Sequence, residues 1–382
     1  MAQPTMGNQI RGNPGMDHKA RQLRLRNALA AHRLDALVVT HPPNILYLCG
    51  FSGSAGALVL THAKSLLFTD GRYTTQARSE VQGAQIVIGR KGPLAAVAYW
   101  LATHSRKNSH RRIPPFRAGI EGEHLSVAAR DRLAAQLPSN CRLRLAPALV
   151  EGARMVKDAQ EIQRIRAAVL TGAGLFERAL AVIHPGVKET DVAAEMEYAA
   201  RQAGAEAMSF PTIVASGSRS ALPHGRASRS AVPARGFVVC DFGVILTDYC
   251  SDMTRTIYVG RPSSEERRAY QAVKEAQQAA VDAVRPGISV GEVDRAARKS
   301  LKNNCLVKYF THSTGHGVGL EIHEAPRVGA GQTEVLQPGM VITVEPGVYL
   351  PGRFGVRIED MVVVTERGCE VLTPTRKELI EI

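Results

Sequence analysis

The sequence predicts an α/β domain over residues 17–150, followed by an α+β domain over residues 151–382 that carries an internal twofold repeat. Three observations lead to this prediction. Helical and apolar strand patterns alternate in the first part, and long amphipathic helices begin near residue 150. A helix–Pro-Gly–helix unit then occurs twice, about 100 residues apart, and apolar strands follow each copy. A chain of 382 residues is long enough to bury the cores of two domains.

The composition is that of an ordinary globular protein, with 45% hydrophobic and 22% charged residues. The net charge of +13 would suit an anionic partner such as nucleic acid. However, the densest basic stretch, residues 105–112, is short and contains no interleaved aromatic residues. We therefore expect a solvated basic surface and no nucleic-acid partner.

The cysteines and the N-terminus indicate where the protein works. Six cysteines are scattered without a Cys-x-x-Cys pair, which favours reduced thiols and a cytoplasmic location. Residues 1–16 lack the apolar segment of a signal peptide, so a flexible tail is predicted there. No apolar run approaches the roughly 20 residues of a membrane-spanning helix, so no contact with a membrane is expected.

The first domain is predicted from alternating patterns. A helix is expected over residues 18–32 and another over 94–104, the second after a shorter helix that precedes residue 85. Strands are expected over four apolar runs, at residues 36–40, 56–61, 65–70 and 85–90. The glycine-rich stretch 50–56 leads into a strand rather than a helix, which argues against a phosphate-binding loop.

The repeat is clearest in its helices. Asp158 and Glu161 form a capping-box pattern that opens a predicted long helix. Ser263 and Glu266 form the same pattern one repeat later. In both copies a Pro-Gly pair ends the long helix and a shorter helix follows, which predicts helices over residues 158–183, 190–203, 264–284 and 290–303. The strand patterns repeat as well, because residues 236–243 resemble 339–347 and residues 250–259 resemble 357–364.

Acidic residues lie at comparable places in the two copies. Asp241 and Asp252 accompany the strands of the first copy, and Glu345 and Glu359 accompany those of the second. A carboxylate at the end of or inside an apolar strand is costly unless it is paired or bound to a metal. Four such acids, together with one imidazole, would balance two divalent cations about 3.5–4 Å apart, a pair that can activate water and polarise a carbonyl.

The stretch THSTGHGVGLEIHEAP, residues 311–326, is the best donor of that imidazole. His312 and His316 have the spacing of two ligands on one helix face, but the glycines at 315, 317 and 319 make a helix improbable. Elsewhere, Arg357 lies two residues before Glu359, so the pattern predicts one shared strand face. That arginine would form a simple ion pair with the carboxylate, orient it for a metal, or do both.

Together these residues resemble the pita-bread metallopeptidases, which comprise methionine aminopeptidase, aminopeptidase P and prolidase. LYLCGFSGSAG and LLFTDGRYTTQA resemble the creatinase-type N-terminal domain of that family. The resemblance implies that the metal ligands are Asp241, Asp252, His316, Glu345 and Glu359. It also implies that His224 in LPHGR, His312 and His323 line the substrate site.

The resemblance further implies an exopeptidase that hydrolyses Xaa-Pro bonds. The N-terminal domain and Arg357 speak against methionine aminopeptidase, which typically lacks the one and usually carries glutamine at the other. We expect an Xaa-Pro aminopeptidase, with an Xaa-Pro dipeptidase as the alternative. A metal-free creatinase-like amidinohydrolase and a non-enzymatic binding module are more remote alternatives.

The implied mechanism assigns roles to single residues. Glu345 would carry a proton from the nucleophile to the proline nitrogen. His224 and His323 would stabilise the scissile carbonyl or the oxyanion, and His312 would support either the substrate or the groups that orient the metal ligands. Oxygen-rich ligands favour manganese as the cation, with cobalt, iron(II) or zinc as alternatives. Short proline-containing peptides are the expected substrates, and a homodimer is expected by analogy with the family.

Overall fold

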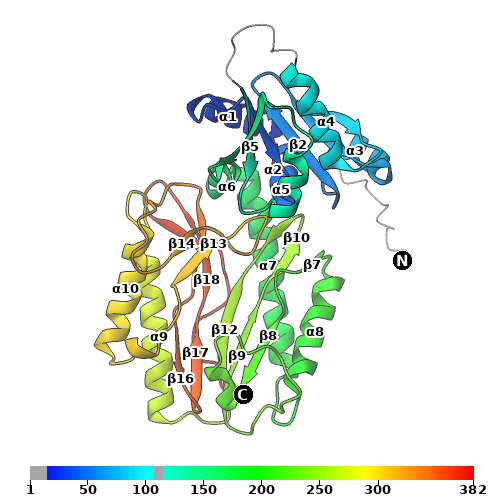
Figure 1. Ribbon diagram of the computed structural model, residues 1–382. Helices are drawn as coiled ribbons and strands as arrows, with labels where there is room; N and C mark the ends of the chain where they lie inside the picture. The colour runs from blue at the N-terminus through cyan, green and yellow to red at the C-terminus, as the bar shows by residue number, and fades with distance from the viewer. Residues whose placement is uncertain (1–14, 107–114) are drawn as a thin grey trace. The chain divides into compact units, whose positions relative to one another are not determined.

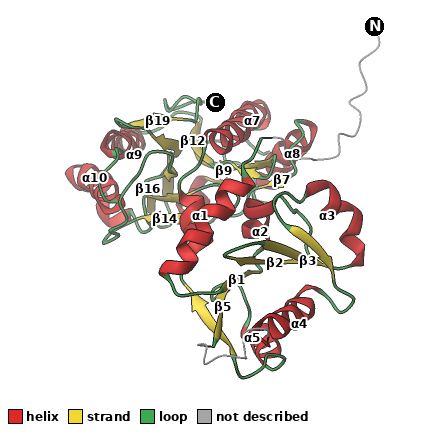
Figure 2. Ribbon diagram, turned by 90° about the horizontal axis from the view of Figure 1, so that it is seen from above, coloured by secondary structure: helices red, strands yellow, loops and turns green. Residues whose placement is uncertain are grey.

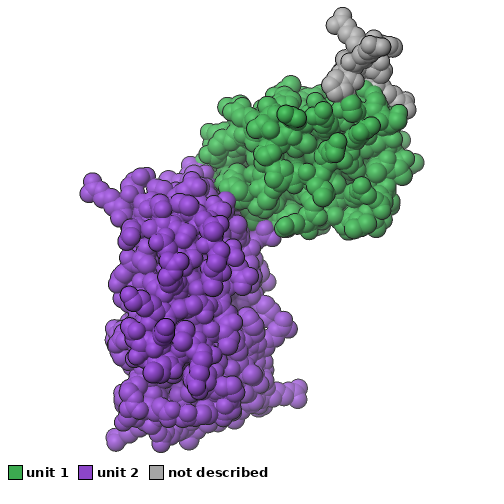
Figure 3. Space-filling view, turned by 60° about the vertical axis from the view of Figure 1, so that its left-hand side comes forward, with its two compact units in different colours: residues 1–154 green, residues 155–382 purple. Residues whose placement is uncertain are grey.

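The structure is a computed structural model that describes residues 15–106 and 115–382. It separates into two compact units, Met1–Arg154 and Met155–Ile382 (Figure 3). The predicted tail over residues 1–16 and the basic stretch over 105–112 fall almost wholly outside the described residues.

The first unit is built on a six-stranded mixed sheet with the strand order β4-β3-β2-β1-β5-β6. Figure 2 shows α1 and α2 on one side of this sheet and α4 and α5 on the other. The strands are β1 (Ala36–Val39), β2 (Gly56–Thr61), β3 (Ser65–Thr69), β4 (Gln85–Ile88), β5 (Phe116–Glu121) and β6 (Cys141–Ala146). The helices are α1 (His18–Ala31), α2 (Pro42–Cys49), α3 (Thr74–Glu80), α4 (Pro93–Arg106), α5 (Val127–Ala134) and α6 (Leu149–Met155), and Gly71–Tyr73 forms a 3₁₀ turn.

The four predicted strands and both predicted long helices of this unit are confirmed. Strands β5 and β6 were not predicted from the sequence. Arginines interrupt their apolar patterns, FRAGIE and CRLRLA, and β6 at the sheet edge has only its first residue fully buried.

The second unit contains the two predicted helix pairs. They are α7 (Ala159–Val182) with α8 (Glu189–Gln202), and α9 (Ser264–Ala283) with α10 (Val290–Asn303). Capping boxes open α7 at Asp158 and α9 at Ser263, as the sequence predicts. Each pair packs on its own hydrophobic cluster, and Figure 1 shows the two pairs on opposite sides of the strands.

The strands of the second unit repeat the same arrangement. The first half has the order β8-β9-β12, and the second half has β13-β15-β18 inside a five-stranded sheet. These six strands are β8 (Ile213–Ser216), β9 (Gly236–Phe242), β12 (Met253–Val259), β13 (Gly315–Gly317), β15 (Val341–Val344) and β18 (Asp360–Val364). The others are β7 (Ala207–Met208), β10 (Val244–Leu246), β11 (Tyr249–Cys250), β14 (Glu324–Val328), β16 (Gly347–Leu350), β17 (Phe354–Arg357) and β19 (Cys369–Val371). Short 3₁₀ segments cover Gly217–Ala221 and Val307–Tyr309.

Three predicted strands are interrupted rather than continuous. The predicted strand over 250–259 is split into β11 and β12. The one over 339–347 contains β15 and then breaks before β16 begins. The one over 357–364 includes only the last residue of β17, then breaks, and continues as β18. The reason is a change of partner, because β17 pairs with β16 whereas β18 pairs with β15. Asp252, Glu345 and Glu359 each lie in one of these breaks, and Asp241 lies within β9.

Candidate metal centre and active site

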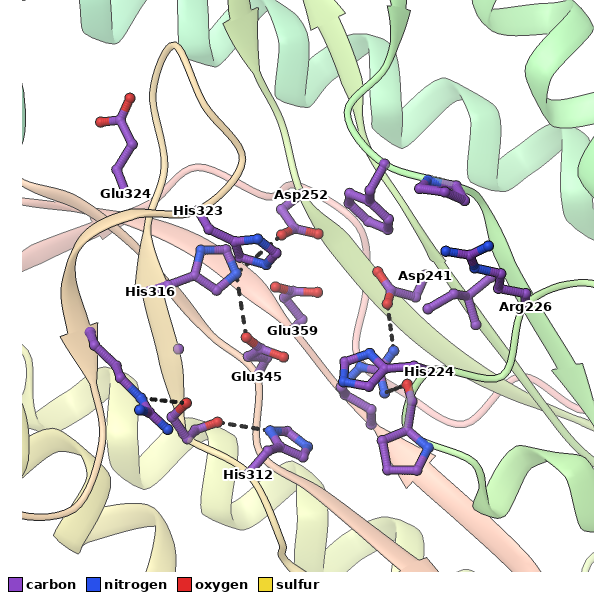
Figure 4. A pocket seen from close by; sticks show the side chains of 18 residues that line it. His224, Arg226, Asp241, Asp252, His312, His316, His323, Glu324, Glu345 and Glu359 are labelled. Carbon is purple, nitrogen blue, oxygen red and sulfur yellow. Dashed lines mark hydrogen bonds and ion pairs between the residues drawn. The ribbon is translucent and has the colours of Figure 1, made fainter. Parts of the chain in front are cut away.

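The strand breaks bring the predicted acids to one cavity of about 630 Å³ in the second unit. A carboxylate at a break leaves the regular alternation of its strand and can point into the space between the two halves. Every side chain predicted for the site lines this cavity: His224, Asp241, Asp252, His312, His316, His323, Glu345, Arg357 and Glu359 (Figure 4).

Three side chains converge closely enough to hold a metal ion. The ligand atoms of Asp252, His316 and Glu359 all lie within 4.8 Å of one another. The Nε2 atom of His316 is 3.5 Å from Asp252 Oδ2 and also 3.5 Å from Glu345 Oε1. Glu345 therefore adjoins the group, whereas the fourth acid, Asp241, is held by an arginine.

The glycines around His316 explain how its strand reaches this position. A Cβ at Gly315 would lie 2.0 Å from the carbonyl oxygen of Thr343, and a Cβ at Gly317 would lie 2.3 Å from that of Ala325. Only glycine allows β13 to approach both neighbouring chain segments so closely. The Nδ1 atom of His316 is 3.0 Å from the carbonyl oxygen of Gly317. A proton on Nδ1 would make that bond and leave the Nε2 lone pair for the carboxylate side.

Burial strongly shifts the pKa values of the acids around His316 and of His316 itself. Burial and the neighbouring acids raise the pKa of Asp252 and of Glu359 well above the usual range. Burial also raises the pKa of Glu345 to about 8 and lowers that of His316 to about 4, so this imidazole is neutral at pH 7. The Oδ1 atom of Asp252 is buried and has no hydrogen-bond partner among the described residues. Carboxylates in this setting, beside a neutral imidazole, fit divalent cations.

Arg357 joins the two halves of the site. Its Nη2 donates to Asp241 Oδ2 at 2.5 Å, and its Nε donates to Thr254 Oγ1 at 3.0 Å. The same threonine hydroxyl donates to Glu359 Oε2 at 2.7 Å. The prediction that Arg357 and Glu359 share the face of one strand is wrong, because β17 ends at the arginine. The arginine binds Asp241 directly and reaches Glu359 only through Thr254.

His312 is held by the protein at both ring nitrogens. Its Nε2 is 2.9 Å from the hydroxyl of Tyr349, and its Nδ1 is 2.8 Å from the carbonyl oxygen of Ser313. The Tyr349 hydroxyl accepts a hydrogen bond from Arg357 Nη1 at 2.7 Å. Burial lowers the pKa of His312 to about 4. The ring therefore supports the cavity wall, and sequence analysis did not anticipate Tyr349.

The other two predicted histidines lie closer to open space. The ring of His323 meets that of His316 edge to face, with centroids 4.5 Å apart, and burial lowers the pKa of His323. His224 is exposed and lines the cavity. Its loop is anchored by the preceding residue, because the Pro223 carbonyl oxygen accepts from Arg357 Nη1 at 3.0 Å.

Sequence analysis also missed three charged residues of the cavity wall, namely Arg226, Glu324 and Arg327. Glu324 forms a buried ion pair with Lys157, whose Nζ is 3.2 Å from Glu324 Oε2. The two arginines follow His224 and His323 by two and four residues in LPHGR and HEAPR. An arginine this close to a predicted substrate-side histidine is the signal that could have revealed them.

No helix within residues 15–106 and 115–382 is long and apolar enough to cross a membrane.

Known proteins resemble the chain over nearly its full length. Residues 163–366 match metallopeptidase family M24, and residues 21–156 match the creatinase/prolidase N-terminal domain. An Xaa-Pro dipeptidase of Pyrococcus horikoshii is 36% identical over 348 residues, which cover 91% of this chain and 95% of that protein.

Solved structures agree with this match. An Xaa-Pro dipeptidase from Bacillus anthracis has a TM-score of 0.90 at 37% identity and covers 96% of this chain and 100% of its own. An X-Pro aminopeptidase from Thermotoga maritima has a TM-score of 0.83 at 33% identity and covers 94% of this chain and 99% of its own. The predicted fold class and the predicted peptidase activity are confirmed, and the family implies divalent metal ions. The chain belongs to metallopeptidase family M24.

Proposed function

We propose that this protein is an Xaa-Pro dipeptidase, which cleaves dipeptides whose second residue is proline. The sequence alone favoured the aminopeptidase, with the dipeptidase as its alternative. Two of the three relatives described above are Xaa-Pro dipeptidases and one is an X-Pro aminopeptidase, so the relatives lean towards the alternative. The main observation behind the proposal is that a positively charged side chain, Arg327, lines the cavity.

Arg327 suits the free carboxylate of a dipeptide. It lies opposite His316 in the pairing of β13 with β14, and it lines the same cavity as the acidic group. Its Nε donates to Ser313 Oγ at 3.4 Å, and no carboxylate among the described residues pairs with its exposed guanidinium. A guanidinium beside the reaction centre offers two parallel hydrogen bonds to a carboxylate. In a dipeptide the proline carboxylate follows the scissile bond by one residue, so it can reach such a group.

We further propose that Asp241, Asp252, His316, Glu345 and Glu359 hold two divalent cations, with manganese as the first candidate. Four carboxylates balance the charge of two such ions, and the orphaned Oδ1 of Asp252 supports this assignment. When bound, the cations activate a water molecule and polarise the scissile carbonyl. The homodimer and the cytoplasmic location remain predictions from the sequence.

The chain's own residues then move protons and hold the substrate. Glu345 takes a proton from the attacking water and passes it to the proline nitrogen. His323 and His224 donate to the carbonyl oxygen as it gains charge, each contributing about 3 kcal/mol. His312, through Tyr349, keeps Arg357 directed at Asp241.

Hydrolysis of three matched substrates, Ala-Pro, Ala-Pro-amide and Ala-Pro-Ala, tests the proposal with manganese supplied. We expect rapid cleavage of Ala-Pro and at least a tenfold lower kcat/KM for the amide and the tripeptide. Cleavage of Ala-Pro-Ala at a rate equal to or above that of Ala-Pro would establish the aminopeptidase instead.

The variant Arg327→Gln separately tests whether Arg327 binds the carboxylate of the dipeptide. It should reduce the preference for Ala-Pro over its amide about tenfold, because the amide never formed the charged contact. Arg229→Gln is the matched control, since this exposed arginine is not part of the cavity wall. An unchanged preference in Arg327→Gln would remove Arg327 from the carboxylate site.

A further inference from the structure

The two unexpected arginines of the cavity occupy equivalent places in the repeat. Phe242 pairs with Met253, which follows Asp252, and Val344 pairs with Asp360, which follows Glu359. When Asp252 is aligned with Glu359, Phe242 is aligned with Val344. The residues that precede these two, Asp241 in the first half and Thr343 in the second, then correspond to each other.

The same correspondence extends to the first strand of each half. Ile213 pairs with Asp241, and His316 donates its backbone N–H to Thr343 Oγ1, so Ile213 corresponds to His316. Ile213 is bridged to Arg226, just as His316 is paired with Arg327. Each half of the repeat therefore places one arginine beside its first strand, at the wall of the same cavity.

The backbone of Arg226 is held by several contacts, whereas its side chain forms no ion pair with a described carboxylate. Besides the bridge to Ile213, its N–H donates to the His224 carbonyl oxygen at 2.9 Å, and its own carbonyl oxygen accepts from Arg219 Nη2 at 2.8 Å. The side chain is exposed, and no carboxylate in the described part of the chain forms an ion pair with it. Asp241, an acid of the same cavity, is bound by Arg357.

The two arginines line the same cavity beside different strands. Figure 4 shows Arg226 beyond Asp241, on the side of the acidic group away from His316. Arg327 borders His316. With the proline carboxylate on Arg327 and the scissile bond at the acidic group, the residue before proline extends towards Arg226. The neighbouring wall at that end is apolar, made of Phe210, Pro211 and Ile213.

We propose that Arg226 selects dipeptides whose residue before proline is acidic, so that Glu-Pro and Asp-Pro are favoured substrates. This inference rests on the proposed dipeptidase function and names the substrate class of the same site. A carboxylate on the residue before proline would receive charge-assisted hydrogen bonds from the guanidinium, whereas a neutral side chain of the same shape would receive weaker ones. A lysine there would meet a like charge.

The test compares kcat/KM for Glu-Pro and for Gln-Pro, which differ in charge and hardly in shape. In the wild-type holoenzyme the ratio should favour Glu-Pro, and it should fall about tenfold in Arg226→Gln. The preference should also weaken as salt is added, because the contact lies at an exposed guanidinium. Arg226→Glu should shift the preference towards Lys-Pro. Arg229→Gln removes the same charge three residues away, outside the cavity wall, and should leave the ratio unchanged.

Failure of this inference can be separated from failure of the proposed function. If Ala-Pro is cleaved but the Glu-Pro to Gln-Pro ratio is the same in wild type and Arg226→Gln, only the role of Arg226 is refuted. If Arg226→Gln instead abolishes the preference for Ala-Pro over its amide, Arg226 binds the proline carboxylate rather than the residue before proline, and the inference is overturned. If no Xaa-Pro dipeptide is cleaved, the proposed function fails, and the inference with it.

Discussion

The two halves of the second unit, residues 159–259 and 264–371, share a scaffold but carry different groups at equivalent positions. Each half has a helix pair, three antiparallel strands and an acid directly before its third strand, Asp252 or Glu359. The first strands differ most. Ile213 stands in the first half where His316 stands in the second. Asp252 and Glu359 are thus equivalent, whereas Asp241 corresponds to Thr343 and Glu345 to Gly243, so the two halves contribute their other carboxylates from different positions.

The residues beside this position show what the imidazole requires. By the same correspondence, Thr212 and Val214 of the first half are equivalent to Gly315 and Gly317. The first half accommodates side chains there, whereas a Cβ at Gly315 would lie 2.0 Å from a backbone oxygen. In the second half, glycines on both sides of His316 let its strand approach the neighbouring backbone closely. His316 thereby contacts Asp252 of the first half and Glu345 of the second.

Charge is also handled differently in the two halves. The first half's Asp241 is bound by a buried arginine that the second half provides. Glu345 of the second half has weaker support, namely the Thr343 hydroxyl at 3.4 Å and the His316 ring at 3.5 Å. Glu345 therefore has weaker contacts with the protein than Asp241 has.

The largest predicted effect comes from removing one acid of either half. Asp252→Asn and Glu359→Gln should each lower kcat/KM for Ala-Pro about 10³-fold, which corresponds to about 4 kcal/mol of transition-state stabilisation. The two losses should be similar because both carboxylates meet the same imidazole. Near-normal rates in one variant would mean that its half does not hold a catalytic cation.

The pH dependence of the metal-free protein should reflect the buried acids of both halves, Asp252, Glu345 and Glu359, whose pKa values are all raised. The pKa of Glu345 rises from 4.5 to about 8 on folding, so the folded chain keeps a proton that the unfolded chain loses. This contribution to the free energy of unfolding is complete below pH 4.5 and is lost as pH rises through about 8, by about 1.4 kcal/mol per pH unit for each such proton. Urea unfolding at several pH values, with chelator or with manganese, measures it. The same slope with and without manganese would contradict the prediction, since bound cations should remove the retained proton.

Arg357→Lys should weaken the link between the halves. Lysine keeps the charge but cannot reproduce the contacts to Asp241, Thr254, Pro223 and Tyr349 at once. A 10- to 100-fold loss of kcat/KM is expected, roughly the effect of removing a group that orients a metal ligand. If the variant retained full activity, positive charge alone would explain the role of this residue.

Gly315→Ala should destabilise the protein by about 1–3 kcal/mol, because its Cβ overpacks the strand against Thr343. Thr212→Val at the equivalent position is the control. The buried Thr212 hydroxyl has no hydrogen-bond partner among the described residues, so its loss should change stability by less than about 1 kcal/mol. Equal effects in urea unfolding would show that the two strands are under the same constraint.

The smallest effect is expected where the halves meet at the surface. Arg166 on α7 forms an ion pair with Glu370 on β19 at 2.8 Å, and the two side chains are 40% and 50% exposed. Arg166→Gln should change the free energy of unfolding by less than about 1 kcal/mol, because water screens such pairs. A loss above 2 kcal/mol would place a substantial part of the contact between the halves at this surface.

Local signals predicted much of this molecule and long-range pairing determined the rest. Capping boxes, Pro-Gly stops and apolar runs located the helix pairs, since these depend on neighbouring residues. The repeat located all four acids. The break after Arg357 was missed because it reflects a change of partner strand, from β16 to β15, which leaves no mark in the local pattern. Arg226 and Arg327 each follow a predicted histidine in the sequence, but their place in the cavity wall depends on pairing with Ile213 and His316, which the local pattern does not show.

If acids from both halves hold the metal ions together, metal binding should depend on one acid of each half. Equilibrium dialysis against manganese should give about two ions per chain for the wild type, as expected for a two-metal site. Asp252→Asn and Glu359→Gln should each lower the stoichiometry or weaken binding by at least 10-fold, with the fold retained by circular dichroism. Two tightly bound ions in both variants would contradict the account.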